Sequence, residues 1–294
     1  MRRSLSPITA CSLAALLALC SAVPLRAADD VSITPDVVYG HKHGLAMTFD
    51  VFQPKENANG AGVLFMVSGG WYSVWAPPET ALPMFRPLLA KGFTVFSVRH
   101  GSSPKFTVPE AVDDVRRAVR FIRLNAERYA VDPERLGVFG GSAGGHLSLI
   151  LGTTADDGDA QAADPVLRTS NRVAAVAAYF PPTDLREFVK PESPYYQRFP
   201  ALRFDQQQAP DMSPLLHVSA GDAPTLLVHG DQDELVPIDH STKIIAALEE
   251  HNVPCELVTI EGAAHGFRGD DNRRAVEALI AWFEKHLGEK SDAE

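Results

Sequence analysis

Short, largely apolar segments, with alternation in 46–52, are interspersed along this chain with longer segments in which apolar residues recur every three or four positions. Segments that are apolar on both faces are typical of buried parallel strands, and the periodic segments are typical of covering helices. This succession of segments predicts an α/β protein with a mainly parallel central sheet and helices on both faces. The expected strands are 46–52, 62–67, 93–98, 136–139, 173–180, 225–229 and 256–260, and the expected helices are 109–129, 146–152, 239–250 and 273–287.

The first 27 residues are predicted to be a secretory signal peptide. Two early arginines precede an apolar run from about residue 10 to residue 19, and the segment ends in the small-residue exit Leu25-Arg26-Ala27. The apolar run is too short to span a bilayer comfortably, so no stable membrane anchor is expected. Residues 28–294 are expected to form one exported domain, periplasmic or extracellular.

Net charge limits which macromolecules this chain is expected to bind, and cysteine content limits its disulfides. The chain carries a net charge of −10, and removal of residues 1–27, which contain three arginines and no acids, would change it to −13. Such a chain is not expected to bind nucleic acid or anionic membranes through its overall field. Removal of the same segment would leave Cys255 as the single cysteine, so no disulfide within one chain is expected.

A sharp strand-to-helix turn is predicted at Gly140-Gly141-Ser142-Ala143-Gly144, which fits the pattern G-x-S-x-G. Such a turn exposes the serine hydroxyl at the N-terminus of a helix, and its glycines leave room where strand and helix meet. The alternatives are an ordinary tight turn or a phosphate-binding loop. A phosphate-binding loop needs a lysine, and none occurs between Lys105 and Lys190.

A serine nucleophile needs a base and an acid, expected after later strands in the order serine, acid, histidine. His265 follows the last expected strand among small residues, and it is the candidate base. Asp233 is the favoured acid, in the loop Gly230–Pro237 after the preceding strand, but Asp231 and Asp184 remain alternatives. No metal and no cofactor are expected.

Backbone N–H groups are the expected stabilisers of an oxyanion formed on the carbonyl that Ser142 attacks. The first is the N–H of Ala143, immediately after the serine. The second comes from the loop Ser68-Gly69-Gly70-Trp71 after an earlier strand, with Gly70 favoured over Trp71. Separately, the long segment 181–224 is rich in proline and aromatic residues, and it is expected to be a lid-like insertion over the sheet.

The segments SGGW, GGSAGGHL, HGDQDELVP and GAAHGF together resemble the α/β-hydrolase fold. Within that fold the chain is similar to secreted carboxylesterases of the BD-FAE, acetyl-xylan-esterase and hormone-sensitive-lipase-like group, from about Tyr39 to Leu287. The resemblance implies Ser142 as nucleophile, Asp233 as acid and His265 as base. One departure is visible, because these families usually begin the oxyanion loop with histidine, and this chain has Val67-Ser68 there.

The expected function is therefore an exported serine hydrolase that cleaves carboxylic esters through an acyl-enzyme. Its expected partner is a small-molecule or polysaccharide ester, with acetyl or feruloyl sugar esters as candidates. The alternatives are a peptidase of the prolyl-oligopeptidase type, which normally carries a large additional domain, and a non-catalytic binding module that retains the fold. The oligomeric state does not follow from the sequence.

Overall fold

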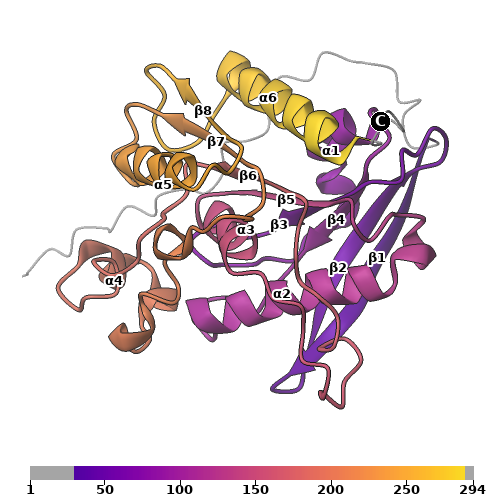
Figure 1. The fold of residues 1–294 in the computed structure, drawn as a ribbon, viewed down its shortest axis with the longest axis horizontal. Helices are drawn as coiled ribbons and strands as arrows, with labels where there is room; N and C mark the ends of the chain where they lie inside the picture. The colour runs from indigo at the N-terminus through magenta and orange to yellow at the C-terminus, as the bar shows by residue number, and fades with distance from the viewer. Residues whose placement is uncertain (1–29, 289–294) are drawn as a thin grey trace, which may run out of the picture.

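The computed structural model describes residues 30–288, which form an eight-stranded sheet with helices on both faces (Figure 1). The strand order is β1-β2-β4-β3-β5-β6-β7-β8. β2 pairs antiparallel with β1 and β4, whereas all other neighbours are parallel. The strands are β1 (Val31–Lys42), β2 (Leu45–Pro54), β3 (Gly62–Met66), β4 (Thr94–Val98), β5 (Leu136–Gly141), β6 (Ala175–Tyr179), β7 (Thr225–Gly230) and β8 (Cys255–Ile260).

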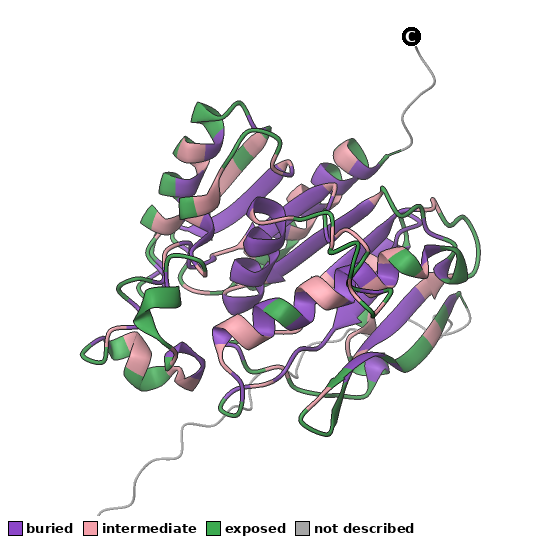
Figure 2. Cartoon of the chain, turned by 60° about the horizontal axis from the view of Figure 1, so that its bottom comes forward, coloured by how far each residue is buried: buried purple, intermediate pink, exposed green. Residues whose placement is uncertain are grey.

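Successive residues of the central strands contribute to two separate cores, one on each face of the sheet. In β3, for example, Val63 packs under one set of helices and Leu64 under the other, and both are fully buried. The face with Leu64 is covered by α2 (Val108–Leu124), α3 (Ala143–Thr153) and α5 (Asp239–Glu250). The face with Val63 is covered by α1 (Leu82–Leu89) and α6 (Gly269–Leu287). Figure 2 shows the central strands and the inner helix faces as buried, whereas β8 at one edge is mostly only partly buried, so the loops at the strand ends are where reactive groups can reach solvent.

The predicted mainly parallel α/β sheet is confirmed, and two elements of it were not predicted. β1 contains Pro35 and two register shifts against β2, which interrupt the alternation of an ordinary strand. α1 contains Pro87 in its interior, where proline normally argues against a helix, and Pro83 in its first turn, where proline is tolerated. The expected helices at 146–152 and 273–287 begin earlier in the structure, at Ala143 and Gly269.

Residues 181–224 lie between β6 and β7 and contain little regular structure. They include the five-residue helix α4 (Pro194–Arg198) and three short 3₁₀ turns, Pro200–Leu202, Gln206–Gln208 and Pro214–His217. The predicted signal peptide, residues 1–27, lies outside the described residues. Among residues 30–288, no helix combines the length and apolarity needed to cross a bilayer.

Candidate active site

Ser142 occupies the turn between β5 and α3 in a backbone conformation that non-glycine residues rarely adopt, with φ 54° and ψ −119°. Its own N–H donates to the Tyr179 carbonyl oxygen at 2.9 Å, which holds the turn against β6. A Cβ atom on Gly140 would lie 2.5 Å from the backbone carbon of Gly144, and one on Gly144 would lie 2.7 Å from the Met66 carbonyl oxygen. Glycines at these two positions therefore permit the close approach that places the serine.

The structure brings Ser142, His265 and Asp233 into one hydrogen-bonded chain. His265 Nε2 lies 3.0 Å from Ser142 Oγ, and His265 Nδ1 lies 2.7 Å from Asp233 Oδ2. The carboxylate accepts at Nδ1, so Nδ1 carries the proton and Nε2 accepts from the serine hydroxyl. This is the arrangement in which histidine can take a proton from serine.

The Asp233 carboxylate is held ionised although its side chain is fully buried. Burial alone would raise its pKa. Hydrogen bonds from His229, His265 and the Val236 N–H outweigh burial and hold the pKa of Asp233 well below its usual range. Its Oδ1 accepts from the N–H groups of both Leu235 and Val236 at 2.9 Å. The Asp233 carboxylate is thus ionised, and its orientation toward His265 is fixed by hydrogen bonds.

The two alternative acids serve other contacts. Asp231 Oδ1 accepts from the Gly262 N–H at 2.7 Å and so joins the loops after β7 and β8. Asp184 forms an ion pair with Arg186 at 2.7 Å. Only Asp233, of the three candidates, lies within hydrogen-bond distance of His265 among the described residues.

His229 is a part of the site that was not identified from the sequence. Its Nε2 lies 3.3 Å from Asp233 Oδ2 and 2.8 Å from the Val236 carbonyl oxygen, and its Nδ1 lies 2.7 Å from Ser241 Oγ. Because the Val236 carbonyl oxygen can only accept, Nε2 of His229 carries the proton. His229 therefore supports the loop after β7 that contains Asp233. The spacing of four residues between His229 and Asp233, across a strand end, is the sequence signal that could have indicated this contact.

Of the three predicted oxyanion donors, Gly70 and Trp71 lie in the loop after β3, and Ala143 is the first residue of α3. The N–H groups of Gly70, Trp71 and Ala143 donate no hydrogen bond within residues 30–288. Gly70 and Ser142 line the same cavity, whereas Trp71 is 3 % exposed and packs beneath the loop. Gly70 has φ 57°, and a Cβ there would meet the Phe199 ring at 2.8 Å. Among the loop candidates, Gly70 is therefore the better placed.

Two buried histidines hold the loop that contains Gly70. His100 Nδ1 lies 2.9 Å from the Gly101 carbonyl oxygen, which places the proton on Nδ1 and leaves Nε2 to accept from Ser68 Oγ at 2.9 Å. His146 Nε2 lies 2.8 Å from the Met212 carbonyl oxygen, so its Nδ1 accepts from the Trp71 indole N–H at 3.4 Å. The histidine that the sequence lacks at the loop start is thus replaced by Ser68 bound to a histidine that follows β4.

Removal of the Ser68 hydroxyl is expected to slow ester hydrolysis. Ser68→Ala should lower kcat for p-nitrophenyl acetate about fivefold with little change in KM, because one neutral hydrogen bond contributes about 1 kcal/mol to holding the loop of the donors in place. Ser68→Thr keeps the hydroxyl and should retain most of the rate. Ser219→Ala, at an exposed hydroxyl bonded only to Asp222, is the control. Equal rates for Ser68→Ala and wild type would refute this account of the loop.

Buried neutral histidines make stability dependent on pH. Burial lowers the pKa of His100, His146 and His240 to about 4, against an ordinary value of 6.5. Between these two values the unfolded chain binds protons that the folded chain does not, so the free energy of unfolding falls as pH falls through that range.

We expect a slope of roughly 1 kcal/mol per pH unit for each of these histidines, measured by urea unfolding between about pH 7 and pH 4.5. His100→Gln should reduce the slope, and His41→Gln, at an exposed residue, should not. A free energy of unfolding that is constant over this range would contradict the neutral assignment.

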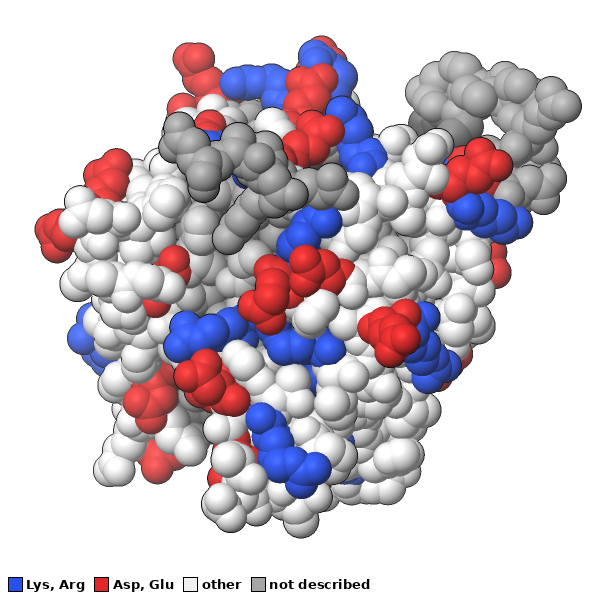
Figure 3. Space-filling view, turned by 45° about the vertical axis from the view of Figure 1, so that its right-hand side comes forward, with Lys and Arg blue, Asp and Glu red and all other residues white. Residues whose placement is uncertain are grey.

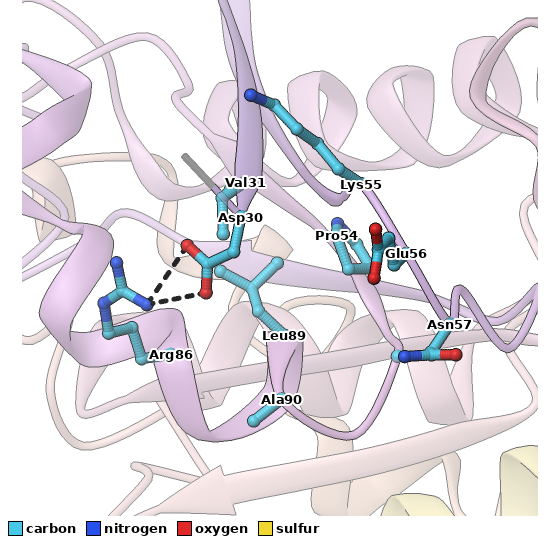
Figure 4. A pocket seen from close by; sticks show the side chains of 10 residues that line it. Asp30, Val31, Pro54, Lys55, Glu56, Asn57, Arg86, Leu89 and Ala90 are labelled. Atoms are coloured by element: carbon cyan, nitrogen blue, oxygen red, sulfur yellow. Dashed lines mark hydrogen bonds and ion pairs between the residues drawn. The ribbon is translucent and has the colours of Figure 1, made fainter. Parts of the chain in front are cut away.

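The site opens into a cavity of about 510 Å³ that contains Ser142 and His265. Phe180 packs edge-on against the His265 ring at 4.6 Å between centroids, and Phe199 of the 181–224 segment lines the same cavity. A second cavity of about 470 Å³ lies at the start of β1 and the end of α1, beside the Asp30–Arg86 ion pair, and contains none of these groups (Figure 4). Within residues 30–288, no cluster of three or more His, Cys, Asp or Glu side chains is placed to hold a metal ion.

The strand order, the strand-serine-helix turn and the histidine after the last strand define this protein as an α/β hydrolase in fold. A solved structure of a truncated carbohydrate esterase from gut microbiota is similar, with a TM-score of 0.74, 26% identity, and coverage of 89% of this chain and 98% of that one. The family model described as BD-FAE matches residues 49–248, and the chain belongs to this family.

Two curated relatives come from Mycobacterium tuberculosis. The probable carboxylic ester hydrolase LipM is 28% identical over 267 residues, which cover 87% of this chain and 61% of LipM. The esterase LipQ is 29% identical over 227 residues, which cover 74% of this chain and 53% of LipQ. The chain thus spans little more than half the length of these relatives.

Proposed function

We propose that this protein hydrolyses carboxylic esters through an acyl-enzyme formed on Ser142. The observation that carries the proposal is the continuous contact from Ser142 Oγ to His265 Nε2 and from His265 Nδ1 to Asp233, at 3.0 Å and 2.7 Å, at the wall of a cavity. The esterase names of its relatives LipM and LipQ support the same activity.

In the acylation step, Ser142 Oγ attacks the ester carbonyl carbon as its proton moves to His265 Nε2. Asp233, charged and fixed, stabilises the imidazolium that results. The carbonyl oxygen becomes an oxyanion, and in this proposal the N–H groups of Ala143 and Gly70 donate to it. In comparable sites each such donor lowers the activation barrier by about 3–4 kcal/mol.

The tetrahedral intermediate collapses when His265 gives the proton to the leaving alkoxide, which breaks the bond between carbon and the alcohol oxygen. The acyl group then remains on Ser142. Water, deprotonated by His265, attacks the acyl carbon by the same route and releases the carboxylic acid, and the proton returns to Ser142. Ester and water enter and acid and alcohol leave, so the cycle needs no further reactant.

For the natural substrate we propose esters of carbohydrates, with acetyl or feruloyl groups as the acids released. The support is the similarity to a carbohydrate esterase and membership of the BD-FAE family. Acidic and basic side chains are interspersed on the face displayed in Figure 3, and the net charge of the chain is −10, which disfavours a polyanionic substrate.

An organophosphonate probe tests the proposed chemistry directly. A fluorophosphonate should label the wild-type protein at one residue, which peptide mapping should identify as Ser142. A protein that does not react, or that reacts elsewhere, would favour a binding module over a hydrolase. Assay of a dipeptide p-nitroanilide beside p-nitrophenyl acetate separates an esterase from a peptidase, and the ester should be the faster substrate.

We also propose that the chain is exported. The support is the sequence of residues 1–27, with its basic start, short apolar run and small-residue exit at Ala27. Expression of the full chain in a bacterial host, followed by fractionation and mass spectrometry of the N-terminus, should find the protein outside the cytoplasm and starting after Ala27. An intact Met1 on active protein in the cytoplasm would refute export.

A further inference from the structure

A third cavity, of about 430 Å³, opens at the same edge of the sheet as Ser142. It lies between the start of β2 and the loops that follow β3 and β4, two parallel strands that end together. Ser68 lines the active-site cavity, whereas Ser73 and Trp75 of the same loop line this one. The two cavities therefore share the loop 68–75 as a wall. We name the third one the Trp75 cavity, and its lining includes Thr48, Ser73, Trp75, Lys105 and Phe106.

The side chain of Trp75 is 56 % exposed and yet is held in one orientation. Its indole N–H donates to the Asp36 carboxylate, whose Oδ1 and Oδ2 lie at 3.1 and 3.3 Å from Nε1. The buried Arg99 side chain donates to Asp36 Oδ1 at 2.8 Å and fixes the carboxylate in turn. A ring supported in this way loses little conformational freedom when a ligand packs on it. The support therefore suits a binding surface.

Asp36 reaches the Trp75 ring because β1 is irregular at this point. The register of β1 against β2 shifts between Thr34 and Val37, and Asp36 has φ 51°. Such a bulge changes the direction of a side chain relative to a regular strand. The Asp36 N–H also donates to the buried Asp50 carboxylate at 2.9 Å, which secures the bulge to β2. The support of the exposed ring is thus built into the sheet.

The wall of the Trp75 cavity offers hydrogen-bond donors beside the ring. Thr48 Oγ1 accepts from the Arg99 side chain at 2.9 Å, and Ser73 Oγ accepts from the His100 N–H at 3.1 Å. Neither hydroxyl donates its own proton to another residue of the described range 30–288. The exposed Lys105 ammonium lies 5.5 Å from the centre of the Phe106 ring and has no acidic partner within that range. Two hydroxyls and one ammonium are therefore available to a ligand.

A flat apolar ring beside unused donors matches the chemistry of a sugar. The C–H groups on one face of a pyranose pack on an aromatic ring, while its hydroxyl and ring oxygens accept hydrogen bonds. A hydrocarbon ligand would leave the donors without acceptors. The net charge of −10 disfavours a polyanion. A volume of about 430 Å³ admits at least one sugar ring, because about 150 Å³ already admits benzene.

We propose that the Trp75 cavity binds a neutral sugar ring of a polysaccharide, separate from the ring whose ester reaches Ser142. This inference rests on the proposed function, since it assigns a second binding site to the alcohol part of the ester. The sugar chain would cross the loop 68–75 and occupy both sides of it. The site takes no part in the chemistry and acts through affinity for long substrates.

Binding of oligosaccharides without ester groups tests the site without catalysis. Xylohexaose and cellohexaose are the probes, and isothermal titration calorimetry measures Kd. The wild-type protein should bind at least one of them, and Trp75→Ala should raise that Kd at least about tenfold, because truncation of an anchoring tryptophan is costly. Trp75→Phe keeps an aromatic face and should bind more tightly than Trp75→Ala. Leu124→Ala, at a similarly exposed apolar residue on α2, is the matched control and should not change Kd.

Kinetics with a long and a short ester test the role of the site in turnover. For xylohexaose acetylated on its ring hydroxyls, Trp75→Ala should raise KM about tenfold and leave kcat within about threefold, as for loss of uniform binding. For p-nitrophenyl acetate, which is too small to occupy both cavities, both constants should stay within about threefold of wild type.

The outcomes separate this inference from the proposed function. Failure of the wild-type protein to bind either oligosaccharide would overturn the sugar site and leave the esterase intact. Equal Kd values for Trp75→Ala and Leu124→Ala would overturn its location. An equal loss of kcat for both esters in Trp75→Ala would show that Trp75 supports the oxyanion loop instead. If p-nitrophenyl acetate is not hydrolysed and a fluorophosphonate does not react, the esterase fails, and the calorimetry still decides whether Trp75 binds a sugar.

Discussion

Replacement of Ser142 with alanine is expected to abolish measurable hydrolysis of p-nitrophenyl acetate. Loss of a serine nucleophile from a comparable triad lowers kcat by a factor of about 10⁶. Here the same removal leaves His265 Nε2 without the hydroxyl that it contacts at 3.0 Å. The measurement is kcat by single-turnover and steady-state assay, together with circular dichroism to establish that the variant is folded.

Ser148→Ala is the matched control for that experiment. Ser148 lies on the same helix, is buried, and donates its hydroxyl to the Gly144 carbonyl oxygen at 2.9 Å, with no contact to His265. Its loss should change kcat by less than about threefold, because it removes one intrahelical bond and no reacting group. Substantial activity in folded Ser142→Ala would eliminate Ser142 from the mechanism.

Replacement of Asp233 with asparagine is expected to lower kcat by a factor of about 10⁴, as in a triad whose acid is made neutral. Asparagine keeps an acceptor for the Leu235 and Val236 N–H groups, so the loop should survive. Its amide nitrogen cannot accept from His265 Nδ1, which would favour the wrong tautomer of that histidine. The pH dependence of kcat measures the change.

Asp231→Asn provides the comparison for the acid. This residue is two positions away in the same loop, and an asparagine there still accepts from the Gly262 N–H. We expect it to retain activity within about threefold of wild type. A larger loss of activity in Asp231→Asn than in Asp233→Asn would show that Asp233 is not the acid.

Much of the architecture could be predicted because central strands of a parallel sheet are apolar on both faces. The strands that became β3 to β7 carry that signal, whereas the edge strand β8 is only partly buried, and the motif at Ser142 lies between β5 and the helix α3. The order of strands then places Asp233 and His265 at the same edge of the sheet, since parallel strands end together. The positions of Asp233 and His265 could therefore be predicted from apolar strand patterns and from the rule that parallel strands end at the same side of a sheet.

Other features depend on contacts between distant segments, which a single sequence does not reveal. Ser68 and His100 are 32 residues apart, and although Ser68 begins the segment SGGW, nothing in the sequence pairs it with His100. The interior proline Pro87 concealed α1, although residues of this helix line the cavity wall. The choice among Asp184, Asp231 and Asp233 required the loop conformation, because all three follow strands.

The contact between Phe199 and Gly70 has a consequence for how activity can diverge in this family. The ring leaves no space for a β-carbon on Gly70, so the inserted segment and the oxyanion loop must remain sterically matched. A substitution within 181–224 can therefore alter turnover while leaving the serine, its base and its acid untouched.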